Sequence, residues 1–432
     1  MQDSQITEIN NAIKQTNPSV FKMLSERGKR IYFPTRGILG QTAEAVGKTI
    51  NATIGTALED DGTTMCLRSA AAQLIDDDTG IFAYAPNLGK PEIRKAWKKM
   101  MLAKNPSIKN EAGISTPIVT AALTHGFSIA GYLFLDKDDA IVTPNLFWEN
   151  YNLILNGAYG SKFLTFPMFN EEGGFNTDAL RRKLRSGRKG KKIVILNFPN
   201  NPTGYTVTEE EAKTTRDIIV EAAEKGSDIV VFVDDAYFGL VFEDGILKES
   251  MFALLANAHE RVLAVKIDGP TKEDYVWGAR VGFITCACAK GGPEFYRAME
   301  SKFGGAIRGS VSSSSNIGQT MLLRAYNSSA YEEEKAQKFE TLRRRYLKIR
   351  EILQERKEYG ERIRPLPFNS GYFMCVEVKS GKAEEVRRVL LERYGTGVIA
   401  TENLLRVAFS STPYDCLEKL YDNIYRAAGE VG

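Results

Sequence analysis

Cysteine and histidine are both scarce in this 432-residue sequence, which contains five cysteines and two histidines. The cysteines are odd in number and scattered, apart from Cys286 and Cys288, so no disulfide framework is expected and a reducing cytoplasm is the predicted location. A zinc site needs four converging nitrogen or sulfur ligands. Because only His125 and His259 could complete one, we interpret Cys286 and Cys288 as buried thiols on one face of a strand and expect no metal.

An excess of charge of either sign is also missing. The 57 Lys and Arg residues against 54 Asp and Glu residues leave a net charge of +3. The basic run from Arg181 to Lys192 has no aromatic residues between its charges, although single-stranded nucleic acid binds by stacking on such residues. We interpret that run as a solvated turn, and expect neither nucleic acid nor membrane as a partner.

Long hydrophobic runs are absent as well. Met1 to Asn10 has no basic segment followed by an apolar one, so no secretory signal is expected. Thr116 to Leu135 lacks Asp, Glu, Lys and Arg, and its length matches a membrane span. Its threonines and glycines, with Pro117 and His125, interrupt the apolar surface. This stretch therefore predicts a buried strand, a turn and a helix.

Short apolar runs alternate with helical patterns between Glu111 and Phe283. That alternation is typical of an α/β fold with a mainly parallel sheet and helices on both faces. The predicted strands are Ile141 to Val142, Ile193 to Leu196, Ile229 to Val233, Val262 to Ile267 and Val281 to Thr285, and the predicted helices include Glu92 to Ala103 and Glu209 to Lys225.

The pattern changes after about Ser310. Apolar residues recur every three or four positions from Tyr331 to Tyr359, which predicts one long amphipathic helix. At this length more than one domain is expected. We predict an N-terminal arm and part of a small domain at 1–60, a large domain at 61–325 and the C-terminal small domain at 326–432. In the last of these, Gly371 to Val378 and Leu404 to Phe409 are the expected strands, and Ala383 to Tyr394 and Asp415 to Ala428 the expected helices.

A set of polar motifs follows the apolar strands in order. Asn197 to Gly204 reads N-F-P-N-N-P-T-G, Asp234 to Tyr237 reads D-D-A-Y, and Thr271-Lys272 and then Arg280 come later. Together they supply an amide, an acid, a phenol, an amine and a guanidinium. These groups are the ones needed to hold and activate pyridoxal phosphate.

From about Asn51 to Phe409 the chain resembles a class I/II aminotransferase, a fold-type I enzyme that depends on pyridoxal 5'-phosphate. The resemblance implies that the large domain binds the cofactor, and that both chain ends contribute to a smaller α+β domain. It also implies a homodimer with shared active sites, and an amino acid and a 2-oxo acid as substrates.

Lys272 is the Schiff-base lysine that the resemblance implies, because Arg280, the expected phosphate clamp, follows it by eight residues as in the family. Lys266 is the rival and lacks that spacing. A nearby cation and partial burial would keep the amine of Lys272 neutral. The family often has a hydroxyl residue where this chain has Gly269, so Thr271 is a candidate to supply that phosphate hydrogen bond.

Asp234 matches the acid that faces the pyridine nitrogen. About 4 kcal/mol is expected between charges about 4 Å apart at an effective dielectric of 20, or about three pKa units. Asp235 is the rival, but strand alternation would turn it to the other face. Tyr237 and Asn201 match the pair that contacts the phenolic oxygen of the cofactor and tunes it.

Further cofactor contacts come from three segments. Leu123 and Thr124 precede a predicted helix whose free amides and dipole favour a phosphate, although Ala122 stands where the family has glycine or serine. Trp148 matches the aromatic residue that stacks on the cofactor ring, with Phe147 as the alternative. Tyr84 matches the tyrosine that reaches the phosphate of the neighbouring subunit.

Substrate recognition is expected to depend on Arg406, whose guanidinium suits an α-carboxylate, with Gly55 beside it. Arg308 resembles the arginine that a partner subunit donates to the distal carboxylate of aspartate or glutamate. The reading is an aminotransferase acting through a Lys272 aldimine, with a dicarboxylic amino acid as candidate substrate. A lyase or decarboxylase of the same fold is the alternative. A nicotinamide-dependent dehydrogenase is disfavoured because no G-x-G-x-x-G opens a βαβ unit.

Overall fold

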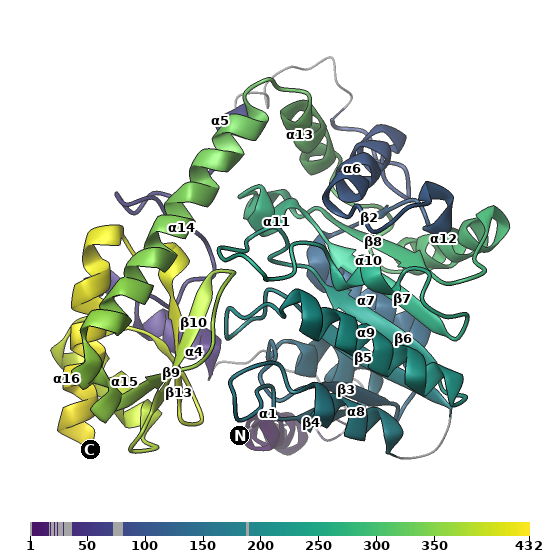
Figure 1. Cartoon of the computed structure of the whole chain (residues 1–432). Coiled ribbons are helices and arrows are strands. Elements are labelled where there is room, and N and C mark those ends of the chain that lie inside the picture. Colours follow the sequence, from purple (N-terminus) through teal and green to yellow (C-terminus); the bar gives the residue numbers. More distant parts are fainter. Residues whose placement is uncertain are drawn as a thin grey trace.

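A seven-stranded sheet forms the centre of the larger part of the molecule (Figure 1). The computed structural model describes residues 2–16, 37–71, 81–186 and 190–432, together with Pro18, Phe21, Leu24 and Lys29. The strand order is β2-β8-β7-β6-β5-β3-β4. The strands are β2 (Ile118–Thr120), β3 (Ala140–Pro144), β4 (Lys162–Phe166), β5 (Lys191–Asn197), β6 (Asp228–Asp234), β7 (Val262–Asp268) and β8 (Gly282–Ala287).

This sheet is mainly parallel, as expected, since β4, β3, β5, β6 and β7 all run in the same direction. The two strands at the other edge, β8 and β2, are antiparallel to their neighbours. The strands β5 and β6 are almost wholly buried, which is why they read as continuous apolar runs rather than alternating ones.

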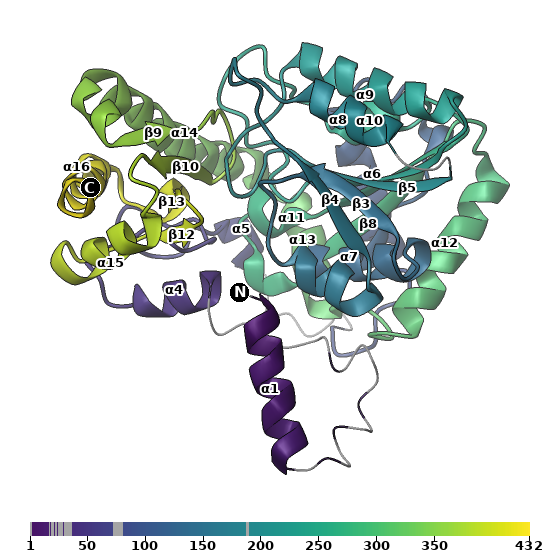
Figure 2. The same ribbon diagram turned by 90° about the horizontal axis from the view of Figure 1, so that it is seen from below.

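Helices cover both faces of the sheet (Figure 2). One face carries α8 (Thr177–Arg185), α9 (Glu209–Glu224) and α10 (Met251–Leu255), and the other carries α7 (Ala122–Phe134) and α12 (Pro293–Arg308). A capping box between Thr208 and Glu211 starts α9. The remaining helices of this part are α6 (Pro91–Lys104), α11 (Pro270–Glu273) and α13 (Asn316–Tyr326), with the short turns η2 (Glu111–Gly113), η3 (Asn152–Gly157) and η4 (Trp277–Ala279).

A smaller four-stranded antiparallel sheet, in the order β12-β13-β10-β9, lies beside the large one. Its members are β9 (Ile363–Pro365), β10 (Phe373–Val378), β12 (Ile399–Thr401) and β13 (Leu404–Ala408), packed with α15 (Ala383–Arg393), α16 (Leu417–Val431), η5 (Lys357–Glu361), η6 (Phe409–Ser411) and η7 (Tyr414–Cys416). The N-terminal part of the chain joins this region, because β1 (Ile50–Asn51) pairs in parallel with β11 (Thr396–Gly397). The other N-terminal elements are α1 (Gln2–Thr16), α4 (Ile38–Glu44) and α5 (Arg68–Ala71).

The long helix α14 (Tyr331–Glu355) connects the two parts of the molecule (Figure 1). It ends at Glu355, four residues before the predicted end at Tyr359, and a separate turn, η5, begins at Lys357. The predicted strand from Gly371 begins instead at Phe373, because the preceding loop hydrogen-bonds to the large part: Ser370 N donates to Gly204 O at 2.9 Å. The domain boundaries at 60 and 325 stay a prediction.

Three smaller expectations need comment. Cys286 lies in β8 but Cys288 lies just beyond its end, so the two thiols do not share a strand. Arg181 and Arg185 belong to α8 and pair with Glu221 rather than forming a turn, while residues 187–189 lie outside the described part of the chain. Thr116 to Leu135 forms β2, a turn and α7. In the described residues, no helix is both long enough and apolar enough to cross a bilayer.

Candidate active site

Several of the predicted site residues lie where the central parallel strands end. Asn197 closes β5, Asp234 closes β6, and the segment after β7 leads into α11, which contains Lys272. The first residues of α7 lie against this segment, because an added Cβ at Gly269 would lie 3.2 Å from Leu123 Cδ1. The carboxyl edge of a parallel sheet is the usual place for a ligand site in an α/β fold.

Asp234 is buried and held by two donors. The Tyr151 hydroxyl donates to one carboxylate oxygen and Ala236 N donates to the other at 3.0 Å. Burial raises the pKa of Asp234, and the Tyr151 hydrogen bond and the charge of Lys272 oppose that rise. Asp235 points elsewhere, since its Oδ2 accepts from Ser250 at 2.5 Å. The two neighbouring acids therefore have separate environments, as strand alternation predicts.

Tyr151 was not identified from the sequence as a site residue. It is fully buried, three residues after Trp148, and the Trp148 ring crosses its ring nearly at right angles with centroids 5.5 Å apart. Phe147 packs between Phe163 of β4, with ring centroids 5.0 Å apart, and Tyr151, with ring centroids 6.2 Å apart. The position of Tyr151 next to the W-E-N string was the available signal, but only the fold brings its hydroxyl to Asp234.

Lys272 lies half-buried with its Nζ 5.0 Å from the centroid of the Tyr237 ring. Burial lowers the pKa of Lys272; Asp234 raises it and Arg280 lowers it further. The Tyr372 hydroxyl donates to the carbonyl of Lys272 at 3.0 Å, which fixes the backbone there. The backbone of Lys272 is therefore restrained, and the lowered pKa shifts its amine toward the neutral form.

The rival, Lys266, is fully buried and committed to ion pairs. Its Nζ lies 2.5 Å from Asp235 Oδ2 and 2.7 Å from Asp268 Oδ2. Those carboxylates raise the pKa of Lys266 against the opposing effect of burial. A charged and doubly paired ammonium is unsuited to nucleophilic attack.

Arg406 lies in β13 and reaches the large part of the molecule. Its Nη1 donates to Asn201 Oδ1 at 3.3 Å, its Nη2 donates to Thr53 O at 3.1 Å, and its guanidinium lies 4.4 Å from the Phe373 ring centroid. Its Nε is buried without a hydrogen-bond partner in the described part of the chain. A Cβ added to Gly55 would contact Phe373 Cζ at 3.9 Å, which is an ordinary contact.

Tyr237 and Asn201 meet at the same place. Burial raises the pKa of Tyr237, whereas the charge of Arg406 and a hydrogen bond from Asn201 lower it. The structure thus brings together Lys272, Asp234, Tyr237, Asn201 and Arg406.

The start of α7 shows backbone strain where a phosphate was expected. Ala122 has a φ of 62°, a left-handed conformation that costs a non-glycine residue about 1–2 kcal/mol. Gly269 explains the missing hydroxyl of the sequence motif, because a Cβ there would lie 2.9 Å from Gly282 Cα. Thr271 Oγ1 is buried and unpartnered within the described residues. Its free hydroxyl fits a phosphate acceptor.

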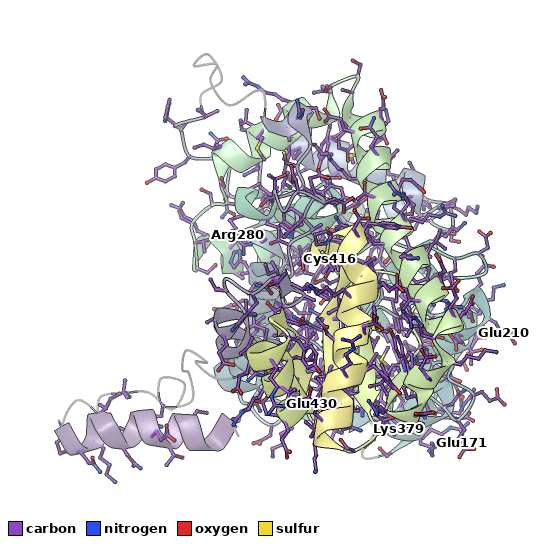
Figure 3. The ribbon with its side chains drawn as sticks, turned by 90° about the vertical axis from the view of Figure 1, so that its left-hand side faces the viewer. Glu171, Glu210, Arg280, Lys379, Cys416 and Glu430 are labelled. Carbon is purple, nitrogen blue, oxygen red and sulfur yellow. The ribbon has the colours of Figure 1, made fainter. Side chains whose placement is uncertain are left out.

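Arg280 is exposed, in a left-handed conformation with a φ of 51° (Figure 3). Among the described residues its one hydrogen bond is long, 3.5 Å from Nη1 to Trp277 O. The guanidinium is therefore still available to pair with an anion.

Tyr84 and Arg308 are not brought to this site within one chain. The Tyr84 side chain is 92% exposed. Arg308 is exposed at the end of α12 and donates to Ser312 Oγ at 2.9 Å. Two residues later, Ser310 Oγ lies 2.9 Å from His125 Nε2, so the segment after α12 is tied to the first turn of α7. Both residues were expected to act on a neighbouring subunit.

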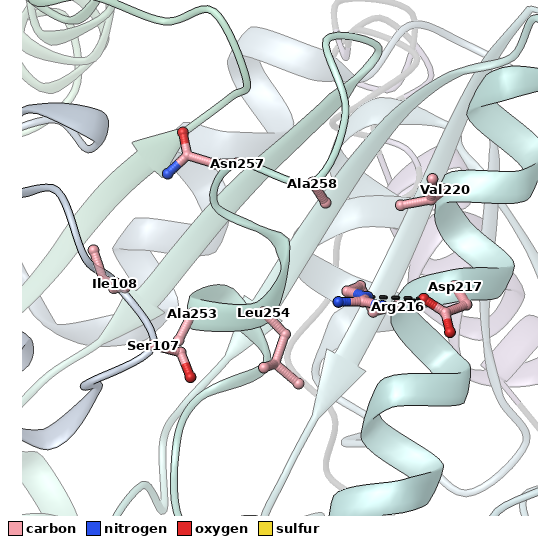
Figure 4. Close-up of a pocket in the computed structure, with 9 residues that line it drawn as sticks. All are labelled: Ser107, Ile108, Arg216, Asp217, Val220, Ala253, Leu254, Asn257 and Ala258. Atoms are coloured by element: carbon pink, nitrogen blue, oxygen red, sulfur yellow. Dashed lines mark hydrogen bonds and ion pairs between the residues drawn. The ribbon is translucent and has the colours of Figure 1, made fainter.

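A shallow pocket of about 410 Å³ lies elsewhere, beside α9 and α10 (Figure 4). Its charged residues neutralise one another, since Arg216 Nε donates to Asp217 Oδ1 at 2.8 Å. None of the predicted site residues lines it.

Comparisons with known proteins identify the family and the fold. The family model described as aminotransferase class I and II matches residues 48–424. The probable aspartate/prephenate aminotransferase of Aquifex aeolicus is 25% identical over 272 residues, 62% of this chain and 63% of that protein. The aspartate aminotransferase of Pyrococcus horikoshii is 26% identical over 239 residues, 54% of each. The chain thus spans between half and two thirds of the length of these curated relatives.

Solved structures match over more of the chain. An aminotransferase from Anaerococcus prevotii has a TM-score of 0.80 at 25% identity, covering 92% of this chain and 98% of that one. The aspartate aminotransferase of Thermus thermophilus with maleate has a TM-score of 0.73 at 21% identity, covering 94% and 99%, and shows likeness of fold. The chain belongs to the class I and II aminotransferase family.

Proposed function

We propose that the protein is a pyridoxal-phosphate-dependent aminotransferase, which moves an amino group between an amino acid and a 2-oxo acid. The observation that carries this proposal is the environment of Lys272: its amine faces Tyr237, and burial and Arg280 lower its pKa. A neutral amine is required both for imine chemistry and for accepting a proton.

Each side chain of the site has a role in this proposal. Bound pyridoxal phosphate would supply an electron sink for the reaction at the substrate Cα. Lys272 would hold the cofactor and move the Cα proton, and the Asp234 carboxylate would hold the proton of the ring nitrogen. Thr271 and Arg280 would bind the phosphate, because among the described residues the Thr271 hydroxyl has no hydrogen-bond partner and the Arg280 guanidinium has no ion pair. Arg406 would bind the α-carboxylate with its Nε–H, which has no hydrogen-bond partner in the part of the chain that the structure describes.

The assembly proposed is a homodimer. Two surface segments are tied together by Asn316 Nδ2, which donates to Ala83 O at 2.8 Å, and by Asn87 Nδ2, which donates to Ser312 O at 2.9 Å. They expose apolar side chains that a second copy would cover: Phe82, Tyr84, Val311 and Ile317. In such a dimer Tyr84 would reach the partner's phosphate. Arg308 would reach the distal carboxylate of aspartate or glutamate, the candidate substrates.

The test uses absorbance of the cofactor-loaded protein with a panel of amino acids and no 2-oxo acid. Transamination predicts a complete spectral change of the cofactor with one equivalent of 2-oxo acid produced, and no ammonia or carbon dioxide. Continuous release of ammonia or carbon dioxide would instead identify a lyase or decarboxylase. Lys272→Ala should retain no covalently bound cofactor after borohydride treatment. A modified peptide containing Lys266 would contradict the assignment of the lysine.

A further inference from the structure

Two carboxylates follow Lys272 directly in the sequence and are buried. Glu273 is the last residue of α11 and Asp274 is the next. Their side chains are 6% and 1% exposed. Burying two carboxylates is unfavourable unless cations and hydrogen-bond donors compensate them. The cations that pair with these acids therefore help to fix the backbone of the segment that carries Lys272.

Lys335, in the second turn of α14, compensates both acids. Its Nζ lies 2.9 Å from Glu273 Oε1 and 2.8 Å from Asp274 Oδ1. Lys104 at the end of α6 also pairs with Glu273. The two acids and two lysines have no net charge, and the pKa of Glu273 is lowered to about 2, because these cations outweigh the effect of burial.

Two tyrosines complete the shell around Asp274. Tyr331 donates to its Oδ1 at 2.8 Å, and Tyr326 donates to its Oδ2 at 2.9 Å. One tyrosine ends α13 and the other begins α14. The segment after Lys272 is thus held by three helices, and by α14 through two side chains.

The same helix extends from this point to the small sheet (Figure 1). In the second half of α14, Arg345 is fully buried and its Nη1 donates to Ser410 O at 2.6 Å. Ser410 lies just after β13, the strand that carries Arg406. One rigid helix therefore contacts both the segment of the catalytic lysine and the neighbourhood of the carboxylate-binding arginine.

We propose that Lys335 is a positioning residue for Lys272: by pairing with Glu273 and Asp274 it fixes the segment that carries Lys272 to α14, and keeps uncompensated negative charge away from the amine. The inference rests on the proposed role of Lys272. Without Lys335, the two acids would turn toward water and the backbone of the lysine would follow. The loss of Lys335 would leave one uncompensated negative charge on Glu273 and Asp274. The groups facing the Lys272 amine are Asp234, Tyr237 and Arg280, and of these only Arg280 is a cation that could compensate that charge.

The test compares Lys335→Met with Lys338→Met in the full-length chain freed of cofactor. Lys338 lies on the same helix but pairs with Glu59, so it is a matched control. One readout is acetylation of Lys272 as a function of pH, followed by peptide mass spectrometry. The other is hydrogen exchange of the backbone amides 271–276.

In Lys335→Met the pH of half-reaction at Lys272 should rise by about one unit, a tenfold change in protonation. Exchange at 271–276 should accelerate at least about tenfold. Lys338→Met should change neither. If Lys335→Met behaves like Lys338→Met at both readouts, the proposal is overturned.

A double variant separates charge from anchoring and guards against failure to fold. The double variant Lys335→Gln with Glu273→Gln leaves one acid, Asp274, and one lysine, Lys104, so the net charge of the four-residue cluster stays zero. We expect the normal half-reaction pH at Lys272 with fast exchange at 271–276; slow exchange here would contradict the anchoring role. These readouts need no bound cofactor. Failure of the proposed function, shown by a cofactor linked to another lysine, is therefore distinguishable from failure of this inference.

Discussion

At the scale of single residues, the motifs predict identities well and contacts poorly. Asp234, Tyr237 and Lys272 come together as their positions after successive strands predict. Tyr151 could not be assigned, because its hydroxyl meets Asp234 across 83 residues of sequence. The need for glycine at position 269 could not be predicted either, because a side chain there would collide with Gly282 on another strand. Tyr84 and Arg308 stay predictions because their expected partners belong to a second chain.

The Tyr151 hydroxyl is predicted to set the acid limit of activity. Burial already raises the pKa of Asp234, and the hydrogen bond from Tyr151 opposes that rise. Tyr151→Phe should raise the pKa of Asp234 further, so that more of the carboxyl is protonated as the pH falls. The acid limb of the pH–rate profile of kcat should therefore move to higher pH. Tyr205→Phe, which removes a hydroxyl bound to Glu211 instead, should leave the limb in place.

At the scale of elements, long periodic segments were predictable and short ones were not. The predicted α9 and α14 begin at Glu209 and Tyr331, as observed, because many apolar positions define their faces. The strand β4 was missed, because it alternates between exposed and partly buried positions at the sheet edge. The strand β2 was expected within Thr116 to Leu135, but its three residues were too few to delimit. The antiparallel direction of β8 depends on tertiary packing, and its composition carries no sign of it.

Gly204 is predicted to be indispensable to the contact between the N-P-T-G turn and β10. It has a φ of 70°, and an added Cβ would lie 1.9 Å from Phe373 O. Gly204→Ala should therefore lower the free energy of unfolding by more than about 3 kcal/mol, through strain and loss of this contact. Gly245→Ala is the control, because Gly245 has a φ of 75° but open space around it. Its cost should be only about 1–2 kcal/mol. Equal losses in urea unfolding would refute the steric argument.

At the scale of the whole molecule, α14 connects the large sheet to the smaller one. The α/β class and the smaller second sheet were predictable, because alternation of strands and helices stops near Ser310. The proposed dimer rests on the family resemblance, since a single chain does not show how two copies would meet. The exposed apolar side chains on the segments near Tyr84 and Ile317 supply a physical reason for such a contact.

The dimer is predicted to fail when charge is placed on that surface. Phe82→Asp combined with Ile317→Asp buries two unpaired carboxylates in the proposed interface, which is unfavourable. Sedimentation should show monomers for this variant and dimers for the unaltered protein, and activity should fall with the loss of Tyr84 from the partner. Leu347→Asp changes a leucine on α14 that is 42% exposed, and it should leave both the dimer and the activity unaltered. A fully active monomer would disprove the shared site.

The pairing of β1 with β11 has a consequence for synthesis on the ribosome. Ile50 N donates to Gly395 O and Ala52 N to Gly397 O, so the early strand waits for a partner that is translated far later. At about 5–20 residues per second, that delay is roughly 20 to 70 seconds. All seven strands of the large sheet emerge in the interval. The nascent chain can thus complete its large sheet first, and Arg406 meets Thr53 only after β13 has been synthesised.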